Sequence, residues 1–245
     1  MKHIVAGALL AASLWAGTVS AADLALPEGI ILPMGEAVSV HRGSDSFLAG
    51  QVEKWLRNPE LEKNIAASLR KSEVFKGKDP SSADRLAKFS IQILDQVRFY
   101  QLQRDEGSVF YQALVLAIPL SDDEVAEANT LSREVLGLTG KDGGSGHDGI
   151  DQVAQAYGPA LMGSVFGDET LSWKEGTSEA GVPYRYASGP VQVEMSGMIL
   201  HYYVTAMAFR DGSRTLFAAA VSEESSGRYF APLLQEALVK AVKGL

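Results

Sequence analysis

The chain has 245 residues, no cysteine and a formal net charge of −8 at pH 7. A chain without cysteine forms no disulfide and carries no lipid-modified cysteine. Its negative charge argues against nucleic acid and anionic membrane surfaces as partners, because both attract basic proteins. Because 46% of the residues are hydrophobic, the chain can bury a core large enough to fold without cross-links.

Residues 1–21 have the pattern of a secretory signal peptide. Lys2 precedes an apolar run from Ile4 to Ala16, and small residues follow up to Ala21. We predict cleavage after Ala21, which makes Ala22 the first residue of the mature chain. The apolar run is shorter than the roughly 20 residues that cross a bilayer, so an uncleaved anchor is the weaker alternative. We expect an exported soluble protein, periplasmic or secreted, with no integral membrane segment after cleavage.

Residues 24–43 predict an extended arm, because Pro and Gly interrupt short apolar runs, and a short strand is expected at Ala37–His41. Two helices should follow, with Ser44–Ser46 as cap candidates for the first. Asn58-Pro59 should end the first helix, and Pro59 should lie in the first turn of the second. Their apolar positions are Leu48, Val52, Trp55 and Leu56 in the first helix, and Leu61, Ile65 and Leu69 in the second. Residues 76–82 predict a loop. Residues 82–94 fit both a helix and an alternating strand, and the helix is favoured.

The middle of the chain predicts a β-hairpin followed by a helix. The strands Val97–Gln103 and Ser108–Ile118 flank an Arg-Asp-Glu-Gly turn, and Pro119 should end the second strand. Ser121 and Glu124 then form a capping-box pattern. The inward positions of the predicted helix are Val125, Ala128, Leu131 and Val135, and its stop signals are Gly137 and Gly140.

The C-terminal region has the same order of elements. The strands Met198–Phe209 and Arg214–Val221 flank an Arg-Asp-Gly-Ser turn, and a helix should begin at about Tyr229. Its apolar stripe is Phe230, Leu233, Leu234, Ala237, Leu238, Ala241 and Val242. The similarity of the two ββα units indicates either an internal duplication or the general preference of hairpin turns for Asp and Gly.

These elements predict an α+β protein of antiparallel β-hairpins packed with amphipathic helices, with two related ββα halves as an open alternative. The expected organisation is a signal peptide (1–21), an N-terminal α+β half (22–138), a glycine-rich linker (139–149) and a C-terminal α+β half (150–245). The C-terminal half should begin with a helix from Ile150 to about Phe166 and contain short strands at 170–174, 182–187 and 191–195. From about Thr170 onward, the plan of hairpins closed by an amphipathic helix resembles exported proteins of the PsbP-like kind. This resemblance concerns the fold and implies no function.

The stretch Gly143–Asp151 fits one copy of the G-G-x-G-x-D-x-U-x pattern of calcium-binding β-helices. In such proteins neighbouring turns share each ion, which needs about 6 to 8 oxygen ligands, and no second copy occurs in the chain. The same residues suit a joint before a helix, with Asp148 as N-cap and Asp151 in the first turn. We favour the joint, and we predict no metal site and no cofactor.

The other motifs do not indicate a catalytic site or a zinc site. Ser68 and Lys71 match the S-x-x-K pattern of serine acyl-enzymes, but the companion elements S-D-N and K-T-G are missing, so we expect both residues on a helix surface. The histidines of the mature chain are His41, His147 and His201. None has a second histidine or a carboxylate at H-E-x-x-H spacing, so the sequence does not indicate a zinc site.

Two features of the last hairpin bear on ligand binding. His201 interrupts a strand that is apolar on both faces, so it is either a hydrogen-bonded core histidine, which is favoured, or a polar group of a ligand pocket with Glu194 as its candidate partner. Small residues also gather on the paired strands and leave space for a closely packed helix or for a ligand, the C-terminal helix being the favoured filler. They are Ala206, Ala208, Ala218, Ala219 and Ala220.

Two classes of function stay open. The favoured one is a non-catalytic exported module that binds a small apolar ligand or a protein partner, because no catalytic constellation occurs and apolar strand surface is abundant. We therefore predict no catalytic residue, and His201 is the one pocket candidate. The alternative is a secreted or periplasmic hydrolase whose active site is dispersed in the sequence and includes His201.

Overall fold

The computed structural model of the protein describes residues 23–36, 38–71, 75, 79–136, 173–195 and 198–244. The predicted signal peptide, the linker 139–149, the helix 150–166 and the two glycine stop signals lie outside these ranges. So does the stretch Gly143–Asp151, and its two interpretations stay predictions. In the described ranges, no helix is both long enough and apolar enough to cross a membrane.

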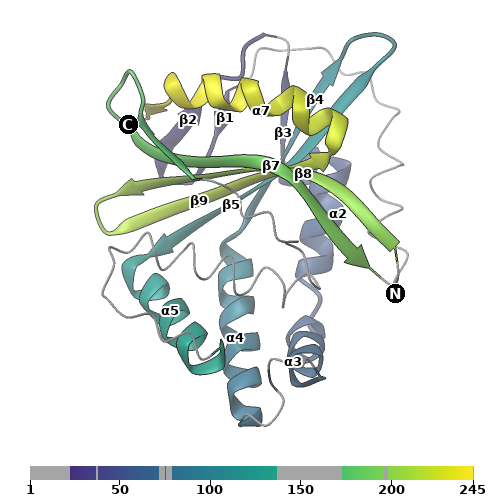
Figure 1. Ribbon diagram of the computed structural model, residues 1–245, viewed down its shortest axis with the longest axis vertical. Helices are drawn as coiled ribbons and strands as arrows, with labels where there is room; N and C mark the ends of the chain where they lie inside the picture. Colours follow the sequence, from purple (N-terminus) through teal and green to yellow (C-terminus); the bar gives the residue numbers. More distant parts are fainter. Residues whose placement is uncertain are drawn as a thin grey trace.

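A seven-stranded antiparallel sheet forms the centre of the protein (Figure 1). Its strands, in spatial order, are β3 (Ser39–Arg42), β4 (Arg98–Asp105), β5 (Phe110–Ser121), β9 (Arg214–Glu223), β8 (Met198–Asp211), β7 (Pro183–Met195) and β6 (Lys174–Thr177). Both predicted hairpins are present, as β4–β5 and β8–β9. They share one sheet because β5 pairs with β9, from Leu114 opposite Val221 to Ser121 opposite Arg214.

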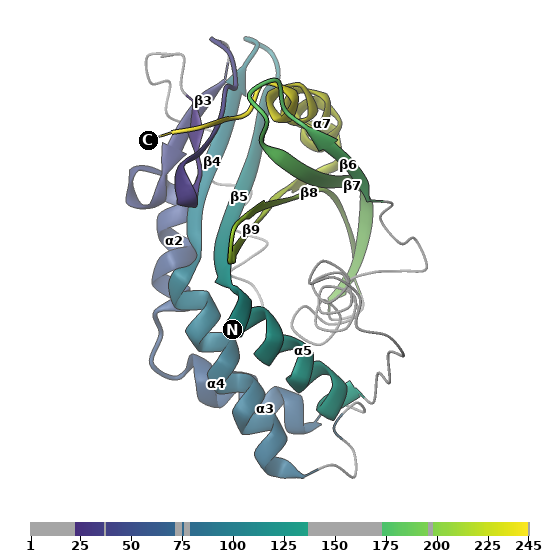
Figure 2. The ribbon, with the colours of Figure 1, turned by 90° about the vertical axis from the view of Figure 1, so that its left-hand side faces the viewer.

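The described helices cover the sheet from both sides. They are α2 (Phe47–Leu56), α3 (Leu61–Lys71), α4 (Pro80–Gln96), α5 (Asp122–Leu136) and α7 (Glu224–Val239). Helix α7 crosses one face, here called the upper face, whereas α3, α4 and α5 project from the opposite, lower face (Figures 1 and 2). The α+β class is confirmed, and the ambiguous residues 82–94 are helical, as favoured.

The first two helices form where the sequence predicts them. Ser46 is the N-cap of α2, and its hydroxyl accepts a hydrogen bond of 3.1 Å from the Ala49 N–H. Leu48 is buried, but Trp55 is 54% exposed, so the predicted inward stripe of α2 includes one residue that faces solvent. Helix α3 packs on α4 through a small core of its own. Its members are Ile65, Ala66, Leu69, Phe75, Ala83, Leu86 and Ala87.

The prediction that Pro119 ends a strand is wrong. Strand β5 continues to Ser121, and Pro119 stands opposite Leu216 of β9. The ladder between β4 and β5 ends at Ala117, so beyond this point β5 is paired only with β9. A residue without an N–H is tolerated there, because one side of the strand has no ladder hydrogen bond to make.

Helix α7 begins earlier than predicted, at Glu224 instead of about Tyr229. Residues Ser225–Gly227 resemble a polar loop in sequence, but Glu223 caps the helix by accepting a hydrogen bond of 3.2 Å from the Ser226 N–H. Gly227 is buried against Tyr203, where a Cβ would lie 2.1 Å from the tyrosine Cβ. The close contact of helix and strand therefore requires glycine at this position.

The predicted stripe of α7 is confirmed except at its end. Its buried members are Phe230, Leu234, Ala237, Leu238 and Ala241, and Leu233 is partly buried. Val242 is 41% exposed and belongs to a short strand, β10 (Val242–Lys243). The strands predicted at 182–187 and 191–195 are also corrected, because they are one continuous strand, β7.

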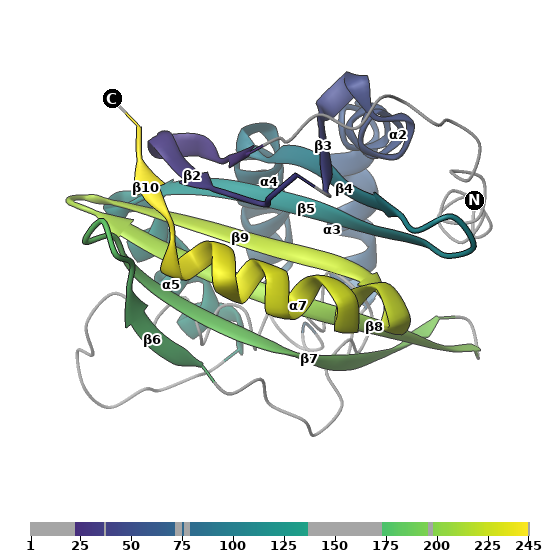
Figure 3. The same cartoon turned by 90° about the horizontal axis from the view of Figure 1, so that it is seen from above.

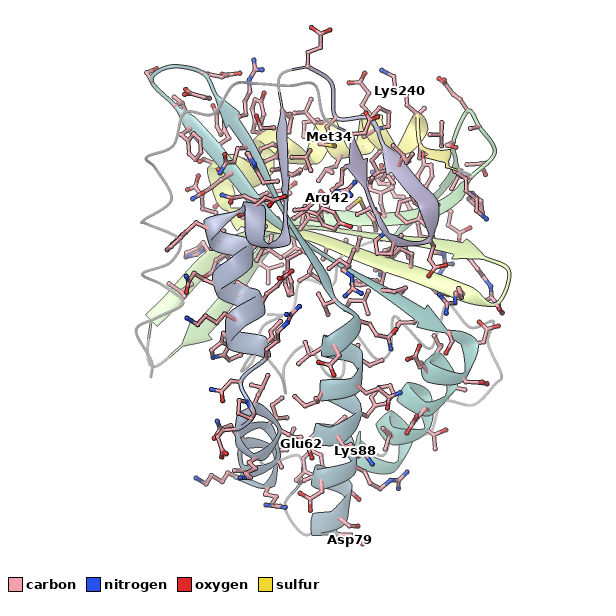
Figure 4. The ribbon with its side chains drawn as sticks, turned by 180° about the vertical axis from the view of Figure 1, so that it is seen from behind. Met34, Arg42, Glu62, Asp79, Lys88 and Lys240 are labelled. Carbon is pink, nitrogen blue, oxygen red and sulfur yellow. The ribbon has the colours of Figure 1, made fainter. Side chains whose placement is uncertain are left out.

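An N-terminal arm, residues 23–38, closes the upper core. Its strands β1 (Leu24–Ala25) and β2 (Ile30–Leu32) form a small sheet with β10, in the order β1-β2-β10 (Figure 3). Six apolar side chains of the arm are at most 5% exposed and share one core with α7: Leu24, Leu26, Ile30, Leu32, Met34 and Val38. Met34 lies beside α7 at the opposite end of the molecule from Asp79, the N-cap of α4 (Figure 4).

The capping box at the start of α5 is confirmed. The Glu124 carboxylate accepts hydrogen bonds from the Ser121 N–H at 2.8 Å and the Ser121 hydroxyl at 3.0 Å, and the Glu124 N–H donates to the same hydroxyl at 3.2 Å. Val125 and Leu131 are buried, as predicted. The side chains of Ala128 and Val135 lie outside the described part of the chain.

The two ββα units place their helices on opposite faces of the sheet. Helix α7 packs on the upper face. Helix α5 packs on α4 below the sheet, through Leu131 against Phe89. Two units related by an axis through the β5–β9 ladder would place both helices on one face, so an internal duplication stays a prediction that this arrangement does not favour.

Truncating the arm should destabilise the fold strongly. Leu32 is fully buried, so Leu32→Ala leaves a cavity and should lower the free energy of unfolding by about 2–5 kcal/mol. Val242 pairs with the same strand but is exposed, so Val242→Ala should change it by less than about 0.5 kcal/mol. Urea unfolding of both variants measures the difference, and equal losses would contradict a core closed by the arm.

The capping box should make stability depend on pH. Burial opposes ionisation of Glu124, but hydrogen bonds from Ser121 and Gln96 and the charge of Arg214 outweigh it and lower the pKa below its ordinary value of 4.5. The ionised carboxylate therefore stabilises the fold above that value, and this contribution is lost as the pH falls through the lower, folded pKa. Glu124→Gln keeps the geometry of the box without the charge. The substitution should lower the free energy of unfolding by about 0.3–1 kcal/mol at pH 7 and leave it unchanged at pH 2. Urea unfolding of both proteins at pH 2, 4 and 7 measures this, and a difference between them that does not change with pH would contradict the prediction.

Candidate ligand-binding face

The alanine run of the last hairpin divides between the two faces of the sheet. Ala218 and Ala220 lie on the upper face, in one core with Phe230 and Leu234 of α7. The C-terminal helix therefore fills the space above these two, as predicted. The other three alanines, at 206, 208 and 219, lie on the lower face, because direct partners in a ladder point to the same side and neighbours along a strand to opposite sides.

The lower face of β7, β8 and β9 carries an apolar cluster around these alanines. Four of its members pack together, Val191, Leu200, Tyr202 and Val204, and Val221 stands opposite Val204. These five residues are here called the lower-face patch. Val191 is buried, and the other four are half-buried. The patch borders a buried row in which Ala206 faces Ala187 on one side and Ala219 on the other.

The described helices cover only part of the lower face. Helices α2 and α4 pack on the β4–β5 side, where Ala49 and Val97 meet Leu114 and Leu116. The described helix that packs on β7 and β8 is α7, which lies on the upper face (Figures 1 and 2). The patch thus lies beside the helix-covered part of the lower face and presents half-buried apolar side chains.

Tyr202 contributes the polar group of the patch. Burial raises the pKa of its phenol above the ordinary value of 10.0. The hydroxyl is therefore neutral at physiological pH and can donate one hydrogen bond beside the apolar side chains of the patch. Its ladder partner is Glu223, so the patch has a carboxylate at this border. Apolar side chains with a few polar groups are the usual composition of a site for a small ligand.

His201 is not the buried histidine that the sequence favours, because its side chain is exposed. Strand β8 pairs with β9 only from Tyr202 onward, so His201 lies on a part of β8 that has β7 as its single neighbour. Its direct partner is Gln192, and Glu194 stands opposite Ile199. The ladder therefore does not pair His201 with its candidate carboxylate, and its role in a pocket stays a prediction.

The remaining sequence candidates are dispersed. Ser68 and Lys71 are exposed on α3, as predicted, and far from the patch. His41 lies on the edge strand β3, and His147 is outside the described residues. Within the described ranges, no group of three or more His, Asp or Glu side chains could hold a metal ion.

A chain of hydrogen bonds across the sheet was missed by sequence reasoning. Gln101 of β4 is only 1% exposed, and its side chain accepts from the Ser46 hydroxyl and donates to the Gln112 side chain at 3.4 Å. The Gln112 N–H donates to the Ser226 hydroxyl at 3.2 Å, and that hydroxyl donates to Glu223 at 3.1 Å. The chain joins the N-termini of α2 and α7 to one pair of strands. Its one signal in the sequence was the position of Gln101, between Tyr100 and Leu102 in the middle of a strand.

The same hydrogen bonds control the ionisation of Glu223. Hydrogen bonds from the Ser225 hydroxyl, and then from the Ser226 hydroxyl and N–H, outweigh the opposing effect of burial and lower the pKa of this carboxyl. Glu223 is thus a stable anion at the N-terminus of α7, where a negative charge is favourable.

Gln101 should be more important to stability than its neighbour on the same face. Gln101→Ala leaves the buried Ser46 hydroxyl without its partner and should lower the free energy of unfolding by about 1–3 kcal/mol. Gln103 points to the same side of β4 but is half exposed, so Gln103→Ala should cost less than about 0.5 kcal/mol. Urea unfolding distinguishes the two, and similar small losses would show that the network contributes little.

No protein-family model matches the chain, and no curated protein matches it.

Proposed function

We propose that the protein is an exported, soluble cell-envelope protein that binds a small apolar ligand at the lower-face patch and catalyses no reaction. The patch is the observation that carries this proposal. It combines half-buried Leu200, Val204 and Val221 with the neutral hydroxyl of Tyr202. Described helices cover the neighbouring strands, but α7, the helix on β7 and β8, lies on the other face.

A small ligand fits the patch better than a protein partner does. Protein interfaces centre on protruding aromatic or Arg side chains that insert into a partner. The patch is half-buried and adjoins a row of alanines instead. Among the described residues, the two most exposed aromatic side chains, Phe47 and Trp55, belong to α2, and Phe110 lies at the tip of the β4–β5 hairpin. A protein partner is therefore the second choice for this surface.

The sequence pattern of residues 1–21 supports export, because Lys2, the apolar run from Ile4 to Ala16 and the small residues up to Ala21 are typical of a signal peptide. The protein also has no cysteine. Its fold rests on a core that an oxidising compartment cannot alter through disulfide exchange.

Ligand binding should depend on Val204. We expect native mass spectrometry of the chain recovered from an exporting host to show a mass consistent with a start at Ala22, together with a bound organic mass that survives a chelator. The apolar dye Nile red should bind the ligand-free protein. Val204→Gln should weaken that binding by at least about tenfold, or about 1.4 kcal/mol, because it replaces an apolar side chain of the patch with a polar amide.

Val109→Gln is the matched control. Val109 is 44% exposed, at the tip of the β4–β5 hairpin, so this substitution should leave dye binding unchanged. Thermal unfolding of both variants shows whether each is folded. Equal dye binding by the two folded variants, or a chain that carries no organic mass and binds no dye, would contradict the proposed site.

A further inference from the structure

Two tyrosine rings are stacked between the central sheet and helix α7. Tyr111 of β5 and Tyr229 of α7 have ring centroids 4.2 Å apart, and their planes differ by only 7°. Both side chains pack against the upper core and are half-buried, so part of each ring is open to solvent. The residues are far apart in the sequence, and their contact forms only where the start of β5 meets α7.

Hydrogen bonds hold the elements that carry these rings. The Gln112 N–H donates to the Ser226 hydroxyl at 3.2 Å, which joins β5 to the first turn of α7 beside the stacked pair. The Tyr229 hydroxyl donates to the Glu106 carboxylate at 3.5 Å. Tyr229 therefore has a group beside its hydroxyl that can accept a proton.

A second tyrosine pair has a different geometry. The rings of Tyr184 and Tyr186, on the same strand, have centroids 6.3 Å apart and planes inclined at 48°. These rings are tilted and farther apart, so their carbons do not lie face to face. The described part of the chain thus contains a stacked tyrosine pair and a tilted one that serves as a comparison.

Stacked phenols in contact suit oxidative coupling. A one-electron oxidant, such as a peroxidase that uses hydrogen peroxide, takes one electron from each phenol, and each hydroxyl loses its proton, that of Tyr229 to Glu106. A tilt of the rings then lets the two radicals form a carbon–carbon bond between carbons next to the hydroxyls. These carbons lose their hydrogens as protons, and the two oxygens take up protons. Hydrogen peroxide accepts two electrons and two protons and becomes two molecules of water.

We propose that Tyr111 and Tyr229 are a site of oxidative modification, at which a one-electron oxidant forms a dityrosine cross-link between β5 and α7. The cross-link closes a long loop of the chain, which lowers the entropy of the unfolded state. Because the chain has no cysteine, this bond supplies a covalent link between distant elements that disulfides cannot supply.

The test treats the full chain, in dilute solution, with a haem peroxidase and hydrogen peroxide. Fluorescence of dityrosine should appear. Peptide mapping by mass spectrometry should find one cross-linked pair of peptides, with Tyr111 in one and Tyr229 in the other, whose mass is lower by two hydrogen atoms than the sum of the two peptides. Because both rings belong to one chain, the fraction of cross-linked chains should not change on about tenfold dilution.

Two variants show whether the stacked pair is responsible. Tyr111→Phe keeps the ring but has no hydroxyl to oxidise, so it should lower the yield of cross-linked Tyr229 at least about tenfold. Tyr186→Phe is the matched control, because Tyr186 is also half-buried and belongs to the tilted pair. It should leave the yield unchanged. Thermal unfolding shows whether both variants are folded.

Three results would overturn the inference. An equal yield of cross-linked Tyr229 in folded Tyr111→Phe would show that Tyr229 couples to another residue. A yield that falls with dilution would show that the coupling joins different chains. The third is the absence of the Tyr111–Tyr229 link under conditions in which free tyrosine forms dityrosine, which would show that the stacked geometry does not lead to coupling.

Discussion

The ladder between β5 and β9 is the constraint on which the rest of the structure depends. It joins the two halves of the chain into one sheet, from Leu114 opposite Val221 to Ser121 opposite Arg214. It also places both strands at the centre, where each carries apolar side chains on both faces. Both faces of the sheet must therefore be covered by other elements. Helix α7 and the arm cover the upper face, and α2 and α4 cover the β4–β5 part of the lower one.

The candidate site follows from this need for elements that pack on both faces of the sheet. On the upper face, small residues of β5 and β9 let α7 approach closely, and Gly227 marks the point of nearest contact with Tyr203. On the lower face, the described helices pack beside β4 and β5, and the apolar side chains of β8 continue past them. The proposed ligand would bind to this apolar surface, which the described helices leave uncovered.

Much of the fold could be predicted from the sequence because its signals are local. The hairpins, the helices and the capping box at Ser121 each depend on residues a few positions apart. Long-range pairing explains what could not be predicted. Pro119 fits within β5 because the ladder with β4 has ended at Ala117, and His201 lies beyond the end of β9, which is Glu223 opposite Tyr202. Strand alternation divides the alanines between two faces, but no periodicity in β9 reveals which of these faces α7 covers.

The arm was predicted to be extended, and its two short strands are extended. The burial of its apolar side chains was not predicted. Residues 24–38 contain Pro and Gly, which are typical of a loop, and their apolar side chains become a core only when the last residues of the chain arrive. The hydrogen-bond chain through Gln101 was missed for the same reason. Ser46 is 55 residues from Gln101 in the sequence, and Ser226 is 114 residues from Gln112. These residues meet only in the folded protein.

The outer edge of β7 has a consequence for assembly. Strand β6 pairs with β7 only from Pro183 to Tyr186, so among the described strands the rest of β7 has β8 as its one neighbour. Pro190 lies within this open stretch and is exposed. Because proline has no N–H to offer, another strand that approached this edge would find its ladder interrupted there. A single imino acid thus opposes edge-to-edge pairing along a long, otherwise regular strand.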